Sequence, residues 1–174
     1  MTIYAMVGAA GAGKDELFRQ AELLAPDRVA RVALGDEIKY QSNGACLSRY
    51  QISAWTEDPD AKARIRPFLE EFGRNHGPQL LPMVIARALR YESEGKVVFV
   101  PRVQNAREMR DWLIIGALPV MVIRPGVAPA TTQEALDIDS IVRMQVPMCT
   151  LVAADLDQVQ RNARALLGLA GVQP

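Results

Sequence analysis

The chain has 174 residues, of which 49% are hydrophobic and 23% charged, a balance typical of globular domains. This length suits one domain with a sizeable core and is too short for two ordinary ones. Twenty basic and twenty acidic residues cancel, which argues against a large nonspecific nucleic-acid-binding surface. No segment approaches the ~20 apolar residues of a membrane span, and the two cysteines lack metal-ligand spacing, so we expect a cytoplasmic protein.

The N-terminal part of the chain is predicted to alternate between strand and helix. An uninterrupted apolar run over residues 2–7 ends at Gly8, which predicts a buried parallel strand. A helix should begin at Lys14, because leucine and alanine recur there at helical spacing. Residues 28–34 predict a second strand, and residues 35–41 the start of another helix.

The middle of the chain is predicted to be helical but interrupted. Over residues 57–78 we expect separate helical pieces, because proline and glycine commonly end helices. The interrupting residues are Pro59, Pro67, Gly73 and Gly77. Residues 78–95 should form one long, mostly buried helix.

The C-terminal part returns to alternating strands and helices. Strands are predicted over residues 96–100, 118–124 and 137–144. Helices are predicted over residues 105–117 and 156–170, with a proline- and glycine-rich loop over residues 125–132. This alternation favours an α/β fold, a central five-stranded parallel sheet with helices on both faces, in a single domain over residues 1–174.

The stretch VGAAGAGKDEL, residues 7–17, carries the strongest motif. Gly8, Gly13 and Lys14 fit the phosphate-binding pattern G-x-x-x-x-G-K-[ST] between a predicted strand and a predicted helix. Glycines allow backbone amides to surround a phosphate, and the lysine would reach the β- and γ-phosphates of a nucleotide. The residues expected to bind nucleotide are Gly8, Ala10, Gly11, Ala12, Gly13, Lys14, Asp15 and Glu16.

Asp15 stands where the pattern has a serine or threonine hydroxyl. A carboxylate beside a triphosphate is repulsive unless a cation lies between them. Asp15 is therefore a candidate Mg²⁺ ligand, directly or through water. The alternative is an ordinary acidic residue that stabilises a helix N-terminus.

The loop resembles the start of the deoxynucleoside monophosphate kinases found mainly in tailed phages, and of animal-type phosphomevalonate kinase, because in both groups an Asp follows the loop lysine. Four later segments resemble other parts of this family in the same order, so the resemblance covers nearly the whole chain. LGDEIK (34–39) is similar to FADxxK, RIRPFLEEFG (64–73) to RxxLQxxGT, VVFVPRVQNAREMRDWLIIGA (97–117) to VVIxDVRFxNExxxIxxxGA, and TTQEALDIDSIV (131–142) to a segment ending in SExxLxxxDxVI.

This resemblance implies a P-loop NTPase with a nucleoside monophosphate kinase-like fold, which uses ATP and Mg²⁺ to phosphorylate the 5′-phosphate of a deoxynucleoside monophosphate. An acceptor-binding helical insertion is expected at residues 40–78. The implied acceptor-binding residues are Asp36, Lys39, Arg66, Arg74, Arg102 and Glu134. The implied partners are small-molecule substrates, without nucleic acid or membrane, and a homodimer stays open.

A short lid loop is expected at residues 124–133. Related kinases carry an arginine-bearing lid, whereas this loop is nearly uncharged after Arg124. Arg124, with Arg107 or Arg110 from the preceding predicted helix, would have to take the part of the lid arginine. The catalytic residues are thus expected to be Lys14, Arg102 and Arg124.

A second departure from the family pattern leaves other functions open. Pro101 replaces the Asp that ends the third strand in the family, so Asp15 and Asp36 would supply the carboxylates. The alternatives are a P-loop kinase for another acceptor, such as a phosphomevalonate-like ester or a modified base in DNA, and a non-catalytic ATP-binding module. Trp55, in the predicted acceptor region, either stacks on a base or serves packing.

Overall fold

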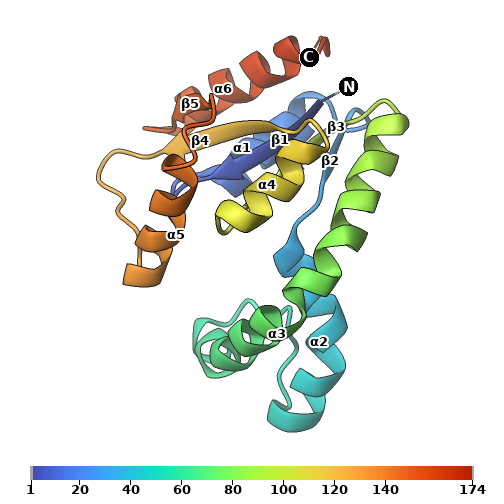
Figure 1. Ribbon diagram of the computed structural model, residues 1–174, viewed down its shortest axis with the longest axis vertical. Helices are drawn as coiled ribbons and strands as arrows, with labels where there is room; N and C mark the ends of the chain where they lie inside the picture. The colour runs from blue at the N-terminus through green and yellow to red at the C-terminus, as the bar shows by residue number, and fades with distance from the viewer. Residues whose placement is uncertain (1, 174) are drawn as a thin grey trace. The chain divides into compact units, whose positions relative to one another are not determined.

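The computed structural model describes residues 2–173 and consists of a parallel sheet and helices (Figure 1). The strands are β1 (Thr2–Val7), β2 (Val29–Arg31), β3 (Val97–Val100), β4 (Leu118–Ile123) and β5 (Cys149–Val152). The helices are α1 (Lys14–Leu24), α2 (Leu34–Tyr50), α3 (Pro59–Ser93), α4 (Ala106–Ile114), α5 (Thr132–Val142) and α6 (Leu156–Leu169). Within the described residues, no helix is both long and apolar enough to cross a membrane.

The sheet has five strands in the order β2-β3-β1-β4-β5, and every pair is parallel. The predicted five-stranded parallel sheet is therefore confirmed. β1 is the central strand, with Ala5 paired to Val100 of β3 and Val7 to Met121 of β4. All five carboxyl ends lie along one edge of the sheet, where open α/β folds bind their ligands.

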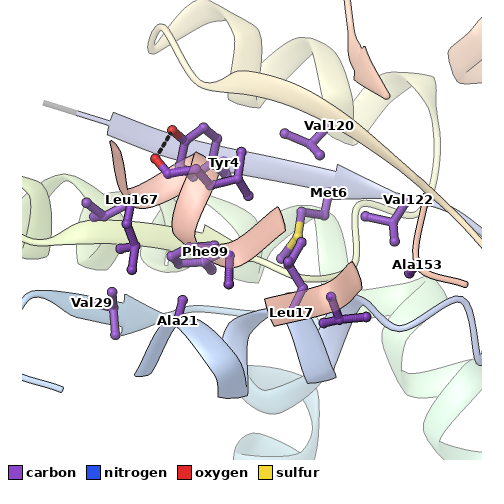
Figure 2. Packing of buried hydrophobic residues seen from close by; sticks show 14 of the residues in the cluster. Tyr4, Met6, Leu17, Ala21, Val29, Phe99, Val120, Val122, Ala153 and Leu167 are labelled. Atoms are coloured by element: carbon purple, nitrogen blue, oxygen red, sulfur yellow. Dashed lines mark hydrogen bonds between the residues drawn. The ribbon is translucent and has the colours of Figure 1, made fainter. Parts of the chain in front are cut away.

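One face of the sheet packs on α1 and α6 and forms the main core (Figure 2). Tyr4 and Met6 of β1 point to this face, where Phe99 of β3 meets the Tyr4 ring at a centroid distance of 5.6 Å. The Tyr4 hydroxyl donates a 2.7 Å hydrogen bond to the backbone carbonyl of Leu166 in α6. Burial of this hydroxyl group raises the pKa of Tyr4 to about 12, so the phenol stays neutral and keeps donating.

The opposite face is covered by α4, which Figure 1 shows on the other side of the sheet from α6. Successive residues of a strand face opposite ways, so Ala5 and Val7 of β1 point away from the α1–α6 layer. Met109 and Trp112 of α4 are fully buried. Helices thus cover both faces, as predicted.

The chain divides into two compact units, one formed by residues 33–86 and the other by the residues before and after them. The sheet belongs to the second of these. The unit of residues 33–86 contains α2 and the greater part of α3. Its range includes the predicted insertion at residues 40–78, whose role in acceptor binding stays a prediction.

The prediction of separate helical pieces over residues 57–78 is wrong, because α3 is continuous from Pro59 to Ser93 and includes three prolines. Ile65, Leu81 and Val84 are buried along this helix, and their burial offsets the hydrogen bonds that prolines remove. Gly73 serves close packing rather than a helix end, because a Cβ there would come within 2.9 Å of the Ile38 side chain.

The prediction of a strand over residues 137–144 is also wrong, since α5 occupies Thr132–Val142 and the fifth strand lies later. The Thr131 side chain accepts a hydrogen bond from the Glu134 amide and so caps α5. This local signal, a threonine three residues before a glutamate, is the sequence pattern of a helix start. The second strand is likewise shorter than the predicted range of residues 28–34.

Gly8 is the position where the fold least tolerates a side chain. Its φ is +144°, and a Cβ there would overlap the carbonyl oxygen of Val122 in β4. We expect Gly8→Ala to lower the free energy of unfolding by about 3 kcal/mol or more, because both backbone strain and a steric clash oppose it. Urea unfolding followed by circular dichroism measures this change.

Gly168 provides the matched control, since it lies inside α6 and a Cβ there meets nothing within 4 Å. Gly168→Ala should raise the free energy of unfolding by about 0.5–1 kcal/mol, the usual gain of alanine over glycine in a helix. Equal effects of the two substitutions would contradict the importance of the Gly8 backbone.

Candidate active site

The phosphate-binding motif forms the turn between β1 and α1, as the sequence predicted. Gly8, Gly11 and Gly13 have φ values of +144°, +77° and +98°, a region that favours glycine. The amide of Ala12 donates a 3.0 Å hydrogen bond to the carbonyl of Ala9, which tightens the turn. The turn ends at the N-terminus of α1, so backbone amides and the helix dipole both favour an anion there.

Lys14 is enclosed by its own loop, with only 8% of its surface exposed. Its Nζ donates hydrogen bonds to the carbonyl oxygens of Gly8, at 2.7 Å, and Ala9, at 2.8 Å. Burial lowers the pKa of the Lys14 ammonium group, and so does the charge of Arg102, whereas Asp15 and Glu134 act in the opposite direction.

These electrostatic effects identify which charged groups surround Lys14. Arg102, beyond the carboxyl end of β3, and Glu134, in α5, both act on the Lys14 ammonium group. The amide of Val103 donates a 2.9 Å hydrogen bond to the carbonyl of Met6, which fixes the segment after β3 beside β1. The structure thus brings together Lys14, Arg102 and Glu134 from three distant parts of the sequence.

Glu134 contacts the phosphate-binding loop directly. Its Oε1 accepts a 2.8 Å hydrogen bond from the amide of Ala10, and its Oε2 accepts a 2.6 Å hydrogen bond from the amide of Ala130. The contact with Ala10 shows that a negatively charged oxygen can reach this amide of the loop. The predicted part of Glu134 in acceptor binding stays a prediction.

Asp15 lies at the surface beside Lys14, with 79% of its side chain exposed. Arg31, at the end of β2, places its guanidinium group 3.2 Å from an Asp15 carboxylate oxygen. An ion pair this exposed adds little to stability, so the Asp15 carboxylate can exchange Arg31 for another cation. Among residues 2–173, no three His, Cys, Asp or Glu side chains form a cluster that could hold a metal ion by themselves.

Glu16, predicted to bind nucleotide, and Arg124, predicted to be catalytic, differ in their contacts. Glu16 pairs with Arg19 through two hydrogen bonds of 2.7 and 2.8 Å and also accepts one from Gln20. The hydrogen bond from Arg19 is the main cause of a lowered Glu16 pKa. Arg124 is exposed at the start of the segment of residues 124–131, where its carbonyl accepts a 3.1 Å hydrogen bond from the amide of Val127.

The predicted acceptor-binding residues Asp36, Lys39, Arg66 and Arg74 all lie in the unit of residues 33–86. The first two are on α2, and the two arginines are exposed on α3. The Lys39 ammonium group lies 5.0 Å from the centroid of the Trp55 ring, at cation–π distance. Trp55 is 45% exposed and is therefore not a core residue.

The loop that carries Trp55 is held by one side chain of α2. Asn43 Oδ1 accepts hydrogen bonds from the Ser53 hydroxyl, at 3.1 Å, and from the Ala54 amide, at 2.9 Å. Ala54, which precedes Trp55 in this loop, is buried. The Trp55 ring thus projects from an anchored backbone and lies at cation–π distance from Lys39.

Sequence reasoning missed two partners of this site. Arg31 pairs with Asp15, and the amide of Ala130 joins the Glu134 carboxylate. The rule that ligand-binding residues follow the carboxyl ends of parallel strands would have found Arg31, which ends β2. Ala130 contributes only its backbone, so its side chain carries no signal.

Comparison with solved structures identifies the fold. A sugar kinase from Janibacter sp. HTCC2649, in an unliganded structure, matches with a TM-score of 0.53 and 12% identity over 100% of this chain and 99% of that one. A gluconokinase from Sinorhizobium meliloti 1021 matches with a TM-score of 0.49 and 16% identity over 98% and 93% of the two chains. No protein-family model and no curated protein matches the sequence. With its parallel sheet and glycine loop, the chain has the α/β fold of the P-loop kinases.

Near the site, Glu108 is a buried carboxyl group, 4% exposed. It accepts hydrogen bonds from the amide of Gln104, at 2.8 Å, and from the Trp112 indole, at 3.4 Å. Burial raises the Glu108 pKa from 4.5 to about 7, against the opposing effects of these hydrogen bonds and of the Arg102 charge. Through its hydrogen bond from the Gln104 amide, Glu108 anchors the turn that follows Arg102.

The raised pKa of Glu108 predicts a pH-dependent stability. The folded-state pKa of Glu108 lies above its unfolded-state pKa. The stability that this group contributes is therefore fully present below pH 4.5 and is lost as the pH rises to about 7. We expect the wild type to lose up to about 3 kcal/mol across this range relative to Glu108→Gln, which cannot titrate. Urea unfolding of both proteins between pH 4.5 and 8 measures this difference. Parallel curves would show that Glu108 titrates normally.

Proposed function

We propose that the protein is an ATP-dependent kinase that transfers the γ-phosphoryl group of ATP to the 5′-phosphate of a deoxynucleoside monophosphate. The observation that carries this proposal is the enclosure of Lys14 in a glycine loop, with Arg102 beside it. Phosphoryl transfer requires cations around the transferred group more than it requires a strong base. The resemblance to phage-type deoxynucleotide kinases supports the choice of acceptor.

In this proposal, ATP binds with its phosphates on the loop of residues 8–15. Lys14 would leave the carbonyls of Gly8 and Ala9 for the β- and γ-phosphates, which replace those carbonyls as acceptors. Arg102 would contact the transferring group, and Arg124 would approach it from the segment of residues 124–131. These cations neutralise the charge that develops on the phosphoryl oxygens during transfer.

Asp15 fits the proposed Mg²⁺. Magnesium in kinases is held by one or two carboxylates together with substrate phosphates and water, so a single exposed carboxylate next to Lys14 is a sufficient protein ligand. When bound, the ion would supply positive charge that neutralises the nucleotide phosphates. Arg31, which pairs with Asp15, would balance the carboxylate when no ion is present.

The unit of residues 33–86 would hold the acceptor. Lys39, Arg66 and Arg74 offer cations to its 5′-phosphate, as the resemblance implies, and Asp36 offers a carboxylate to its sugar or base. The exposed Trp55 ring beside Lys39 would stack on the base, because aromatic rings accept any base face.

A coupled assay of ADP release tests the proposed activity. We expect turnover with ATP, Mg²⁺ and one or two members of a panel of deoxynucleoside monophosphates that includes modified pyrimidines. Lys14→Ala should lower kcat/KM about a hundredfold or more, because it removes a cation from the transition state. Lys96→Ala is the matched control, since Lys96 precedes β3, at the opposite end of the strand from Arg102. Its kcat/KM should equal that of the wild type.

The same panel distinguishes the alternatives. Phosphomevalonate and an oligonucleotide with modified bases test the other acceptors that the resemblance left open. A set of sugars completes it, because the Janibacter neighbour is described as a sugar kinase. ATP binding without any transfer across the panel would contradict the kinase and favour a non-catalytic module.

The Mg²⁺ dependence of the rate tests the part proposed for Asp15. We expect Asp15→Asn to raise the Mg²⁺ concentration needed for half-maximal rate about tenfold, because an amide is a weaker ligand than a carboxylate. Asp157→Asn is the control, as Asp157 is a first-turn acid of α6 and contributes only to the helix dipole. An unchanged Mg²⁺ requirement in Asp15→Asn would reduce Asp15 to the same ordinary helix-end role.

A further inference from the structure

The contact between Glu134 and Ala10 serves no purpose for the helix that carries Glu134. Thr131 caps α5 by accepting from the Glu134 amide at 3.1 Å, and Glu134 Oε2 completes the helix start by accepting from the amide of Ala130. Glu134 Oε1 is left over by this arrangement and accepts from Ala10, at 2.8 Å. One carboxylate thus joins the N-terminus of α5 to the phosphate-binding loop.

Two carboxylates lie among the charged groups around Lys14, and Arg31 pairs with one of them. Lys14 and Arg102 are the two cations, and Asp15 and Glu134 are the two carboxylates that act on the Lys14 ammonium group. Nucleotide phosphates would add several negative charges to this partly enclosed site. Like charges that share a site repel strongly when water is scarce. Asp15 can be neutralised by Mg²⁺, whereas the bond from Ala10 commits Glu134 Oε1 to the loop itself.

We propose that the Glu134 carboxylate competes with nucleotide phosphate for the Ala10 amide of the phosphate-binding loop, as an internal anion, and that a nucleotide phosphate replaces it there on binding. This inference rests on the proposed nucleotide site at residues 8–15. The exchange conserves one hydrogen bond at Ala10, because a phosphate oxygen takes the place of Oε1. It also removes the hydrogen bond that joins the N-terminal turn of α5 to the loop.

If phosphate replaces the Glu134 carboxylate at the Ala10 amide, the charge of this carboxylate should weaken ligand binding. Glu134→Gln keeps an oxygen acceptor and the size of the side chain but removes the negative charge. A neutral amide competes less well with phosphate and does not repel it. We therefore expect Glu134→Gln to bind ATP and inorganic tripolyphosphate about tenfold more tightly than the wild type.

Isothermal titration calorimetry without Mg²⁺ measures both affinities. Glu22→Gln is the matched control, because Glu22 is exposed on α1 and loses the same charge, and its affinities should stay within about twofold of the wild type. Equal or weaker binding by Glu134→Gln would overturn the proposal, since the carboxylate would then support nucleotide binding or play no part in it.

A measurement on the wild type keeps the test independent of how well the variant folds. The carboxyl ¹³C resonance of Glu134 should shift on addition of tripolyphosphate, because Oε1 loses its hydrogen bond from Ala10. A resonance that stays in place at saturating tripolyphosphate would overturn replacement.

These outcomes are separate from those of the kinase assay, because neither readout involves phosphoryl transfer. A protein that binds tripolyphosphate with the expected difference but transfers no phosphoryl group would support replacement and contradict the kinase. Absence of binding in both the wild type and Glu134→Gln would overturn replacement and the nucleotide site together.

Discussion

The buried ammonium group of Lys14 is the constraint around which this structure is organised. A charge removed from water must be paired or hydrogen-bonded, and here two carbonyl oxygens of the preceding turn accept from it. Those carbonyls point inward only because the neighbouring glycines adopt positive φ values. This turn also lies against β4, which leaves no room for a side chain at Gly8. The central strand, its neighbour and the lysine therefore form one steric and electrostatic unit.

The charged groups around this lysine come from elements that are distant in sequence but adjacent in the sheet. Arg102 follows β3 and Glu134 follows the segment after β4, and these two strands flank β1. The parallel topology delivers both side chains to the same edge, so the electrostatic character of the site is a direct result of strand order. Glu108 supports this arrangement because it accepts a hydrogen bond from the amide of Gln104 in the turn after Arg102.

The sequence predicted the sheet and the loop because both rest on local patterns. A buried strand, glycines at fixed spacing and a lysine at a helix start are readable without tertiary information, and all three were confirmed for residues 2–14. The continuous α3 could not be predicted in this way, since its prolines argue for interruption and only the burial of residues such as Val84 outweighs them. The strand expected at residues 137–144 is instead part of a helix that Thr131 caps, and Ile141 is its buried residue.

Within the site, the position of a residue could be predicted where its side chain belongs to a motif, whereas the roles of the site residues stay predictions. Lys14 and Arg102 come together as the motif and the strand-end rule require. The link from Glu134 to Ala10 could not be predicted, because it joins a side chain to a backbone amide that any residue would provide. The pairing of Asp15 with Arg31 depends on where β2 ends, which the sequence placed three residues too late.

The two tryptophans stand in contrasting surroundings, and this gives the protein two distinct optical reporters. Trp112 of α4 is fully buried, whereas Trp55 is 45% exposed and lies beside the Lys39 ammonium group. An enclosed indole emits at shorter wavelength than a hydrated one, and a nearby cation alters the emission of the ring it touches. Intrinsic fluorescence can therefore follow the sheet core and the unit of residues 33–86 separately, without any added dye.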